Sequence, residues 1–382
     1  MPEDKKEAKQ TYAYTPGLKI KEAMTVTKTR RLPIPGNVFV EEGDEVVTEK
    51  VVAETRVPGM PVVVPAIMKL GIMPESLPEL MEKKLGEQVK EGEILARYNM
   101  FFGLVKRVLP SPIDGTVENI SNVTGQIIVR GKEIPVSIDA YIPGKVVEVM
   151  PNEGVIIETS GAFIQGIFGI GGERRGQLRV VVDSPTAPIT VELVTQEDKG
   201  KILVGGGVLT LEALRKAVDV GVAGIIVGGI DSGDLMEFMG SDIGVAITGE
   251  EEYGITLIVT EGFGQMAMHQ KTFSIFKKYA GRDASINGTT QIRAGVIRPE
   301  VVIPHKDAVA ETEEAALSEG MVPGTPLRII RNPYFGAIGK LVSLPVELQK
   351  VESGSYVRVL EAELEDGSRV IVPRANVEII EE

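Results

Sequence analysis

The chain has 382 residues, which suits two to four domains, and its 43% hydrophobic and 25% charged residues are typical of a globular protein. It has no cysteine, which excludes disulfides, thiolate nucleophiles and cysteine-ligated zinc or iron–sulfur clusters. Two histidines are too few for a histidine-rich metal site. The formal net charge of −13 argues against a protein that sheathes nucleic acid over its whole surface.

The start of the chain, MPEDKKEAKQ, is charged and lacks the apolar core of a secretory signal. No apolar run approaches the ~20 residues that cross a bilayer, so we expect no membrane span. We therefore predict a cytoplasmic protein whose residues 1–20 form a disordered tail. Abundant Glu, Lys and Val, without Cys or Trp, is typical of a thermophile.

Residues 21–170 are predicted to form a β-rich region, because short Val and Ile runs alternate with Gly, Pro and acidic turns. Examples are LGEQVKEGEILARY and SPIDGTVENISNVTGQIIV. The repeated Gly-x-Val and Glu-x-Gly-Asp/Glu-x-Val resemble the half-repeat of biotinyl/lipoyl-like domains, the barrel-sandwich hybrid. SPIDGTVENI also resembles the barrel of NqrA/RnfC-type electron-transfer subunits. The resemblance implies a barrel-sandwich-hybrid-like fold.

The stretch Glu22-Ala23-Met24 resembles the hairpin tip that carries the modified lysine in biotinyl domains, but Thr25 stands at the lysine position. A threonine hydroxyl cannot form the amide that attaches biotin or lipoate. Lys69, in AIMKLG, is followed by two prolines and a short amphipathic helix instead of a strand, so we interpret it as a loop lysine. We expect no covalent biotin or lipoate. The predicted helix carries Leu77, Leu80, Met81 and Leu85.

The glycine-rich junction GAFIQGIFGIGGERRGQL, residues 161–178, has two interpretations. NqrA/RnfC-type proteins carry a Gly-Gly loop after their barrel that binds flavin or nicotinamide nucleotide, and successive glycine N–H groups with Arg174 and Arg175 would form an anion cradle. A dinucleotide fingerprint, however, opens a helix, and the segment that follows here is the strand LRVVVD. We favour a hinge between domains.

Residues 171–305 are predicted to form a small doubly wound α/β domain. Short apolar strands such as KILVGG and GIIVGG alternate with the helical patterns TLEALRKAVDVG, SGDLMEFMG and GQMAMHQKTFSIFKKYAG. Neither histidine has a catalytic partner at a recognisable spacing, so we place His269 on the surface or core edge of a helix and His305 in a polar linker.

Ligands of open α/β sheets bind beyond the carboxyl ends of the strands, where this sequence places glycines and acids. One hypothesis is a ligand pocket: carboxylates there are able to hold a metal ion or a cationic or hydroxylated ligand, and glycines at a helix start are able to accept an anion, although we assign no metal ligands. Glycine and acidic residues are also ordinary loop residues, and that alternative stays open. SINGTTQIRAG, with Asn287, Thr289 and Gln291, would complete the pocket. The predicted pocket residues are Gly205, Gly206, Gly207, Asp231, Glu250, Glu261 and Arg293.

Residues 306–320 are predicted to be an acidic linker, and residues 321–382 resemble a KOW domain, as at the C-terminus of NusG. The resemblance rests on the strand around Arg328, the run PYFG, GKLV and two closing strands, and implies an SH3-like barrel. It also implies a face that contacts RNA, a ribosomal protein or a polymerase-associated partner. The residues of that face are Arg328, Arg331, Tyr334 and Phe335.

The fold class predicted is therefore multidomain, α/β plus all-β. The function we favour is a non-catalytic adaptor or scaffold that binds a protein or nucleoprotein partner through its KOW and β-barrel modules. One alternative is a nucleotide- or flavin-binding enzyme subunit of NqrA/RnfC-like ancestry. Another is a transcription- or translation-associated factor. The residues do not identify a ligand, a reaction or an oligomeric state.

Overall fold

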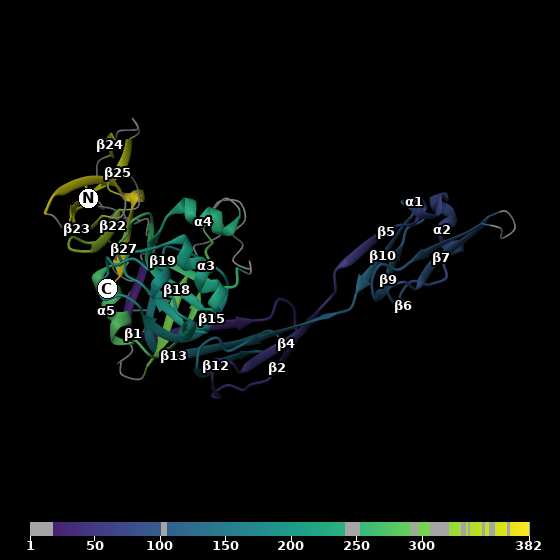
Figure 1. Ribbon diagram of the computed structural model, residues 1–382, viewed down its shortest axis with the longest axis horizontal. Helices are drawn as coiled ribbons and strands as arrows, with labels where there is room; N and C mark the ends of the chain where they lie inside the picture. Colours follow the sequence, from purple (N-terminus) through teal and green to yellow (C-terminus); the bar gives the residue numbers. More distant parts are fainter. Residues whose placement is uncertain are drawn as a thin grey trace, which may run out of the picture. The chain divides into compact units, whose positions relative to one another are not determined.

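The computed structural model describes residues 18–100, 105–240, 253–291, 297–305, 321–329, 334, 337–345, 348–350, 356–364 and 367–381. This part of the chain is mixed α/β and dominated by strands (Figure 1). No helix in it is both long and apolar enough to cross a membrane. The chain divides into two compact units: unit 1 comprises Met1–Lys28, Tyr141–Lys145 and Glu158–Glu382, and unit 2 comprises Thr29–Ala140 and Val146–Ile157.

Unit 2 contains a small antiparallel sheet in which the central strand β4 pairs with β11 on one side and β2 on the other. Because Val57 pairs with Ile134, the chain leaves β4 and enters β11 at neighbouring positions. Residues 58–133 are thus an insertion between two paired strands, and we call them the inserted lobe. The strands outside it are β2 (Asn37–Val38), β3 (Glu45–Val46), β4 (Val51–Val57), β11 (Ile134–Asp139) and parts of β1 (Leu18–Arg31), β12 (Gly144–Met150) and β13 (Gly154–Gln165).

The inserted lobe has a hydrophobic core of its own, which includes the fully buried Leu70, Leu95, Leu109 and Ile127. Four strands pair in the order β5-β10-β9-β6, and β7 and β8 form a hairpin. Its elements are β5 (Pro61–Pro65), α1 (Ala66–Leu70), a 3₁₀ turn (Pro74–Ser76), α2 (Leu77–Leu80), β6 (Gln88–Val89), β7 (Ile94–Met100), β8 (Val105–Pro110), β9 (Gly115–Ile120) and β10 (Gln126–Gly131).

Prolines protect the free edge of this sheet. Strand β5 pairs with β10 on one side only. The Gly131 N–H donates to the Met60 carbonyl at 3.1 Å. The backbone groups of every second residue of β5 from Met60 on therefore point toward β10, and those of Pro61, Val63 and Pro65 face the open edge. Two of these three residues have no N–H to offer another strand, so the edge resists extension.

Unit 1 is built on a mixed sheet in which β15, β16, β18 and β19 run parallel and β14 closes the edge antiparallel to β19. The predicted alternation of apolar strands and helices is confirmed here. The elements are β14 (Phe168–Ile170), β15 (Glu173–Val180), 3₁₀ turns at Val191–Leu193 and Gln196–Asp198, β16 (Ile202–Val204), β17 (Val208–Leu209), α3 (Leu211–Val220), β18 (Gly224–Ile230), α4 (Ser232–Met239), β19 (Thr256–Phe263) and α5 (Gln270–Lys278).

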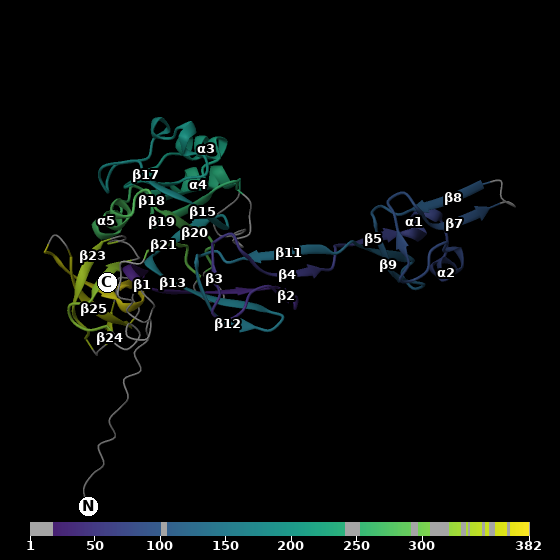
Figure 2. The same ribbon diagram turned by 90° about the horizontal axis from the view of Figure 1, so that it is seen from below.

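Helices cover both faces of the parallel strands. Leu203 and Ile225 face a core shared with α3 and α4 (Figure 2), whereas Ile202 and Ile226 face a core shared with α5. This alternation explains why the strands read as continuous apolar runs. Strand β15 also belongs to an antiparallel sheet with β20 (Asp283–Asn287), β21 (Glu300–Pro304) and β13.

The C-terminal β domain, residues 321–381, has antiparallel strands around a core that includes Leu327, Leu341, Leu360 and Val377. Its last strand pairs in parallel with the start of β1, which ties the two ends of the described chain together. Its elements are β22 (Pro326–Ile329), β23 (Ile338–Ser343), β24 (Leu348–Lys350), β25 (Tyr356–Leu364), β26 (Arg369–Pro373), a 3₁₀ turn (Arg374–Asn376) and β27 (Val377–Glu381).

The predicted carrier hairpin at the start of the chain is wrong. Strand β1 runs without a break over Leu18–Arg31, and Thr25 lies in its middle. Buried Leu18, Ile20, Met24 and Val26 recur on one side of the strand, and no glycine or proline interrupts this period of two. The Glu-Ala-Met stretch is therefore ordinary strand sequence.

The glycine-rich junction is neither a hinge nor a loop, because residues 161–178 lie largely in β13, β14 and β15. A Cβ atom at Gly169 would lie 2.6 Å from the Gly288 carbonyl oxygen and 2.8 Å from that of Leu257, so glycine is needed for close backbone packing. The compact units also divide the chain differently from the predicted ranges, since residues 158–170 belong to unit 1.

His305 was predicted to lie in a polar linker, but it is buried at the end of β21. Its ring stacks on Tyr279 with 4.6 Å between centroids, and its Nε2 lies 2.8 Å from the Glu22 carbonyl oxygen. The tail predicted for residues 1–20 is wrong at its end, because residues 18–20 belong to β1. Residues 1–17 and the predicted acidic linker (306–320) lie outside the described residues.

Candidate functional site

The carboxyl edge of the parallel strands brings several predicted pocket residues together. Val208, directly after the three glycines, pairs with Gly229, and Gly229 pairs with Gly262 of the next strand. Gly205–Gly207, Asp231 and Glu261 therefore end neighbouring strands, as the sequence predicts. Glu250 and Arg293 lie outside the described residues.

The glycines at this edge contact the protein's own backbone. A Cβ atom at Gly206 would collide with the Ser184 carbonyl and Pro185, and one at Gly228 would lie 2.5 Å from both the Met266 oxygen and the Met268 nitrogen. The Met268 N–H donates to the Gly206 carbonyl at 2.7 Å. The space in which an anion was predicted to bind holds the segments 184–187 and 264–268.

We call residues 264–268 the strap. The strap also explains why α5 begins later than its sequence pattern predicts. The pattern GQMAMHQKTFSIFKKYAG predicts a helix from its start, but α5 begins only at Gln270, and His269 is its N-terminal cap residue. The preceding residues give their backbone groups to the strand ends, as the bond from Met268 to Gly206 shows. Tertiary hydrogen bonds thus override a helical pattern.

Asp231 caps a helix. Its carboxylate accepts hydrogen bonds from the N–H groups of Gly233 at 2.7 Å and Asp234 at 3.3 Å, at the start of α4. The side chain satisfies orphan donors of the first turn and places a negative charge at the positive end of the helix. One of its oxygens is thereby committed to the fold.

Of the two predicted pocket carboxylates that the structure describes, Asp231 is exposed and Glu261 is buried, with both of its oxygens engaged. One accepts the N–H of His269 at 2.9 Å, so Glu261 holds the residue that precedes the first turn of α5. The other pairs with the guanidinium of Arg328, which comes from β22 of the C-terminal β domain. Arg328 also donates to the Thr260 carbonyl at 3.3 Å.

Arg328 therefore does not belong to an exposed contact face, which corrects the prediction made for it. It is 1% exposed, although arginine is almost never fully buried without a partner. A signal for this pair was present in the sequence: Arg328 in TPLRII and Glu261 in TLIVTEGF are single charges of opposite sign within apolar strands. Opposite charges in two buried runs favour a mutual pair.

Several polar atoms around this pair have no hydrogen-bond partner: His269 Nδ1, Thr272 Oγ1 and Arg328 Nε. The Glu261 carboxylate is saturated by its own chain, so it offers neither a free base nor an open metal ligand. Among the residues that the structure describes, no group of three His, Asp or Glu side chains could hold a metal ion.

The remaining predicted residues are dispersed. The Asn287 side chain accepts the N–H of Thr289 at 2.9 Å and so forms a local turn. Tyr334 is half-exposed, while Arg331 and Phe335 lie outside the described residues. Lys69 is an exposed residue of α1 and not, as predicted, of a loop. The helix predicted after it is reduced to a 3₁₀ turn and α2, and Leu85 is exposed.

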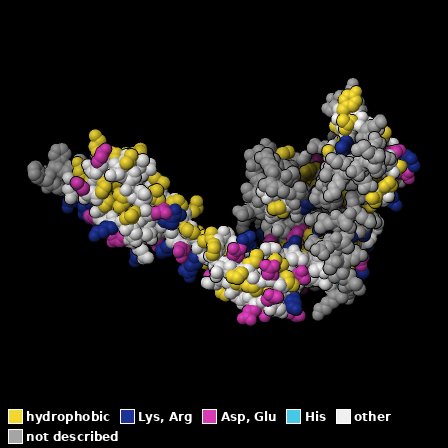
Figure 3. All heavy atoms as spheres, turned by 180° about the vertical axis from the view of Figure 1, so that it is seen from behind, with side chains coloured by type: hydrophobic (Ala, Val, Ile, Leu, Met, Phe, Trp, Pro, Cys, Tyr) yellow, Lys and Arg dark blue, Asp and Glu magenta, His cyan; other side chains and the backbone are white. Residues whose placement is uncertain are grey.

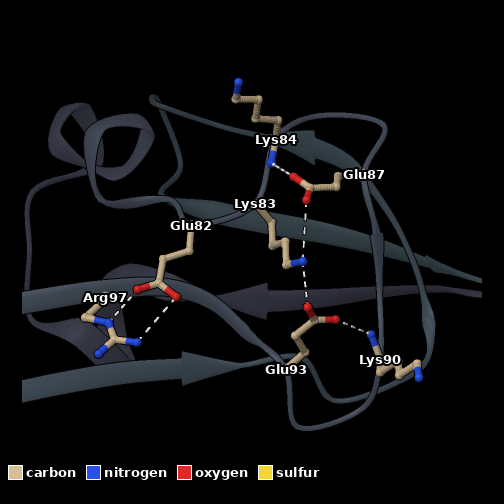
Figure 4. Close-up of polar contacts among 7 residues, drawn as sticks. All are labelled: Glu82, Lys83, Lys84, Glu87, Lys90, Glu93 and Arg97. Atoms are coloured by element: carbon tan, nitrogen blue, oxygen red, sulfur yellow. Dashed lines mark hydrogen bonds and ion pairs between the residues drawn. The ribbon is translucent and has the colours of Figure 1, made fainter.

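The inserted lobe carries its charges differently, in a network near its surface (Figure 4). Lys83 lies 2.6 Å from Glu93 and 3.4 Å from Glu87. The hydrogen bond to Glu93 raises the pKa of Lys83, and the same bond, with the Lys90 N–H, lowers the pKa of Glu93. The Lys84 N–H is the main cause that lowers the pKa of Glu87.

Comparison with models of known protein families found no match, and a search of curated protein sequences found no relative of this chain. Its function must therefore be inferred from the geometry described above.

Proposed function

We propose that the chain is a non-catalytic adaptor that binds a protein or nucleoprotein partner through its C-terminal β domain and its β-rich modules. The observation that supports this proposal most is how the predicted ligand groups are used. Gly206 and Gly228 pack against the protein's own backbone, and the carboxylates of Asp231 and Glu261 accept backbone N–H groups at the starts of two helices. We further propose that the C-terminal β domain is a KOW-like barrel and that residues 21–170 derive from barrel-sandwich hybrids.

The partner-binding face that we propose is the hairpin of β24 and β25. Leu348 pairs with Arg358 across the hairpin, and Tyr356 follows on the same side at a spacing of two. Leu348 and Tyr356 are 56% and 66% exposed, and Arg358 is exposed as well. Aromatic and arginine side chains are enriched where proteins bind partners, so this face replaces the buried Arg328 as the contact surface.

Site-specific crosslinking tests the proposal. The chain with a photoreactive phenylalanine analogue at position 356 is expressed in its native cells, with the analogue at position 371 as a matched control because Ile371 is 57% exposed on another strand. The proposal expects a defined adduct from position 356 that Leu348→Glu abolishes. No adduct, or equal adducts from both positions, would contradict it.

RNA is a second candidate partner, because Tyr356 and Arg358 on one face could stack on a base and pair with a phosphate. The acidic chain would then bind weakly and with a steep dependence on salt. Titration of labelled single-stranded RNA at low salt, with Arg358→Ala as the variant, separates this outcome from protein binding.

The alternative of a nucleotide- or flavin-binding enzyme subunit makes a different prediction. Protein purified from its native cells would carry a chromophore or a nucleotide detectable by absorbance and mass analysis. If the unaltered chain and the Gly206→Ala variant bound equal amounts of nucleotide, the nucleotide would bind away from the predicted edge. A nucleotide lost in that variant, with the fold retained, would overturn the adaptor proposal.

A further inference from the structure

The inserted lobe exposes methionine side chains to an unusual degree. Met60, Met68 and Met73 are 79%, 81% and 72% exposed, more than any other methionine whose side chain the structure describes. Methionine is flexible and polarisable, and surfaces rich in it adapt to a binding partner. Leu85 and Val123 of the same lobe are also exposed.

Two neighbouring segments carry the centre of this surface. The Ile67 N–H donates to the Gly125 carbonyl at 3.2 Å, and Gly125 packs against the Ile67 side chain. The start of α1 therefore lies beside the turn between β9 and β10, which brings Met68 and Val123 onto adjoining segments. We call Met68, Met73 and Val123 the methionine surface. Figure 3 shows hydrophobic side chains gathered over the inserted lobe.

The charge of the inserted lobe differs from that of the remaining chain. Residues 58–133 hold nine Lys and Arg and nine Asp and Glu, so the whole formal charge of −13 belongs to the rest of the protein. Several of its charges also pair with each other, as Lys83 does with Glu93, Arg97 with Glu82 and Arg130 with Glu118. The lobe thus combines exposed apolar side chains with electrical neutrality.

We propose that the methionine surface binds the methionine surface of a second copy of this chain. Two copies repel each other through their acidic parts, and the neutral lobe is where they can approach without that repulsion. A contact of a surface with itself is the twofold arrangement of most homodimers. Large contiguous apolar patches are rare on monomeric proteins and mark interaction sites.

Two other modes of contact fit less well. Addition of a strand to β5 is blocked, because Pro61 and Pro65 face the open edge of that strand. Attachment to an anionic membrane is favoured by an excess of Lys and Arg, and the lobe as a whole holds equal numbers of basic and acidic residues. The contact is therefore made by side chains of α1, of the segment that follows it and of the β9–β10 turn.

Sedimentation equilibrium of the full chain tests the proposal. The expected mass at about 10–100 μM is twice the 41.1 kDa of one chain. Because a twofold contact contains each residue twice, Met68→Glu raises the dissociation constant by at least about 100-fold. Met68→Leu keeps the dimer. Higher salt tightens the dimer, since it screens the repulsion between the acidic parts.

The matched control is Met236→Glu in α4 of unit 1, where the methionine is 36% exposed. This variant is expected to dimerise like the unaltered chain. Circular dichroism must show that each variant is folded. The proposal is overturned if the unaltered chain is a monomer at about 100 μM, if Met68→Glu dimerises normally, or if Met236→Glu weakens the dimer equally.

Flotation with phosphatidylcholine vesicles adds a distinct outcome. A chain that stays monomeric and floats with the vesicles, but no longer floats as Met68→Glu, would assign the methionine surface to lipid and overturn the dimer. A dimer that does not float supports the proposal.

Discussion

The carboxyl edge of the parallel sheet and the inserted lobe use the same kinds of residue in opposite ways. At the edge, Glu261 and Arg328 are buried and saturated by their own chain. In the lobe, Lys83 and Glu93 pair at the surface, while Met68 faces solvent. The charges at the edge therefore stabilise the fold, whereas the exposed side chains of the lobe are accessible to a partner. Variants should separate these roles by the size of their effects.

Arg328→Ala should have the largest effect, because it leaves the carboxylate of Glu261 buried without its counterion. Breaking one partner of a buried pair costs about 3–5 kcal/mol of unfolding free energy. Urea denaturation followed by circular dichroism or tyrosine fluorescence measures this loss, since the chain has no tryptophan.

The double variant Arg328→Met with Glu261→Gln is the control. It removes both charges together, and replacing a buried pair in this way is often neutral. We expect it to recover most of the stability lost in Arg328→Ala. A single variant as stable as the unaltered chain would show that the pair does not hold the C-terminal β domain to the sheet.

Gly228→Ala should have the next largest effect. The added methyl group would lie 2.5 Å from the Met266 oxygen and the Met268 nitrogen, both in the strap that fills the predicted pocket. Overpacking of this kind costs roughly 1–3 kcal/mol. Gly172→Ala is a matched control, since a Cβ atom there meets nothing within 4 Å. Equal urea midpoints for the two variants would mean that the strap is not packed against the strand.

The sequence predicts the parallel strands and α3 well because their signals are local. Thr210 caps α3 by accepting the Ala213 N–H at 3.3 Å, and Gly221 ends the helix with φ 82°. Both are recognisable from residue type alone. The convergence of the glycine and acid loops also followed from the topology of parallel strands.

The segments that fill the predicted site could not be predicted from the sequence in the same way. Segments 184–187 and 264–268 fill it through backbone hydrogen bonds, such as that from Met268 to Gly206, which leave no pattern of side chains. The insertion of residues 58–133 was missed for a similar reason, since it depends on the pairing of Val57 with Ile134. Long-range pairing is a property of the whole fold, and composition does not encode it.

Asp231→Ala should have a smaller effect, on α4 alone. Loss of an N-terminal cap costs about 1 kcal/mol. Asp231→Asn keeps an oxygen that can accept the Gly233 N–H and should retain most of the stability. The urea midpoints of the two variants test this order. If Asn were as damaging as Ala, the charge of Asp231 would have a role beyond the cap.

Lys83→Ala should have the smallest effect on stability, because exposed ion pairs are screened by solvent and salt. Its effect should appear in titration. The hydrogen bond from Lys83 is the main cause that lowers the pKa of Glu93, so in the variant this pKa should rise toward its ordinary value. Carboxyl ¹³C NMR of glutamate-labelled protein measures the change. Glu192, whose pKa is lowered mainly by Thr190, is the control and should not move.

The sign of the pH dependence follows from the direction of the shift. A carboxylate whose pKa is lowered in the folded state stabilises the fold above the pKa of about 4.3 that it has when unfolded, and this contribution is lost as the pH falls through the folded value. Any difference in urea midpoint between Lys83→Ala and the unaltered chain should therefore be full above about pH 4.3 and should disappear once the pH has fallen below the lowered pKa of folded Glu93. A difference that persisted where Glu93 is protonated in the folded protein would place the role of Lys83 in the packing of its alkyl chain rather than in its charge.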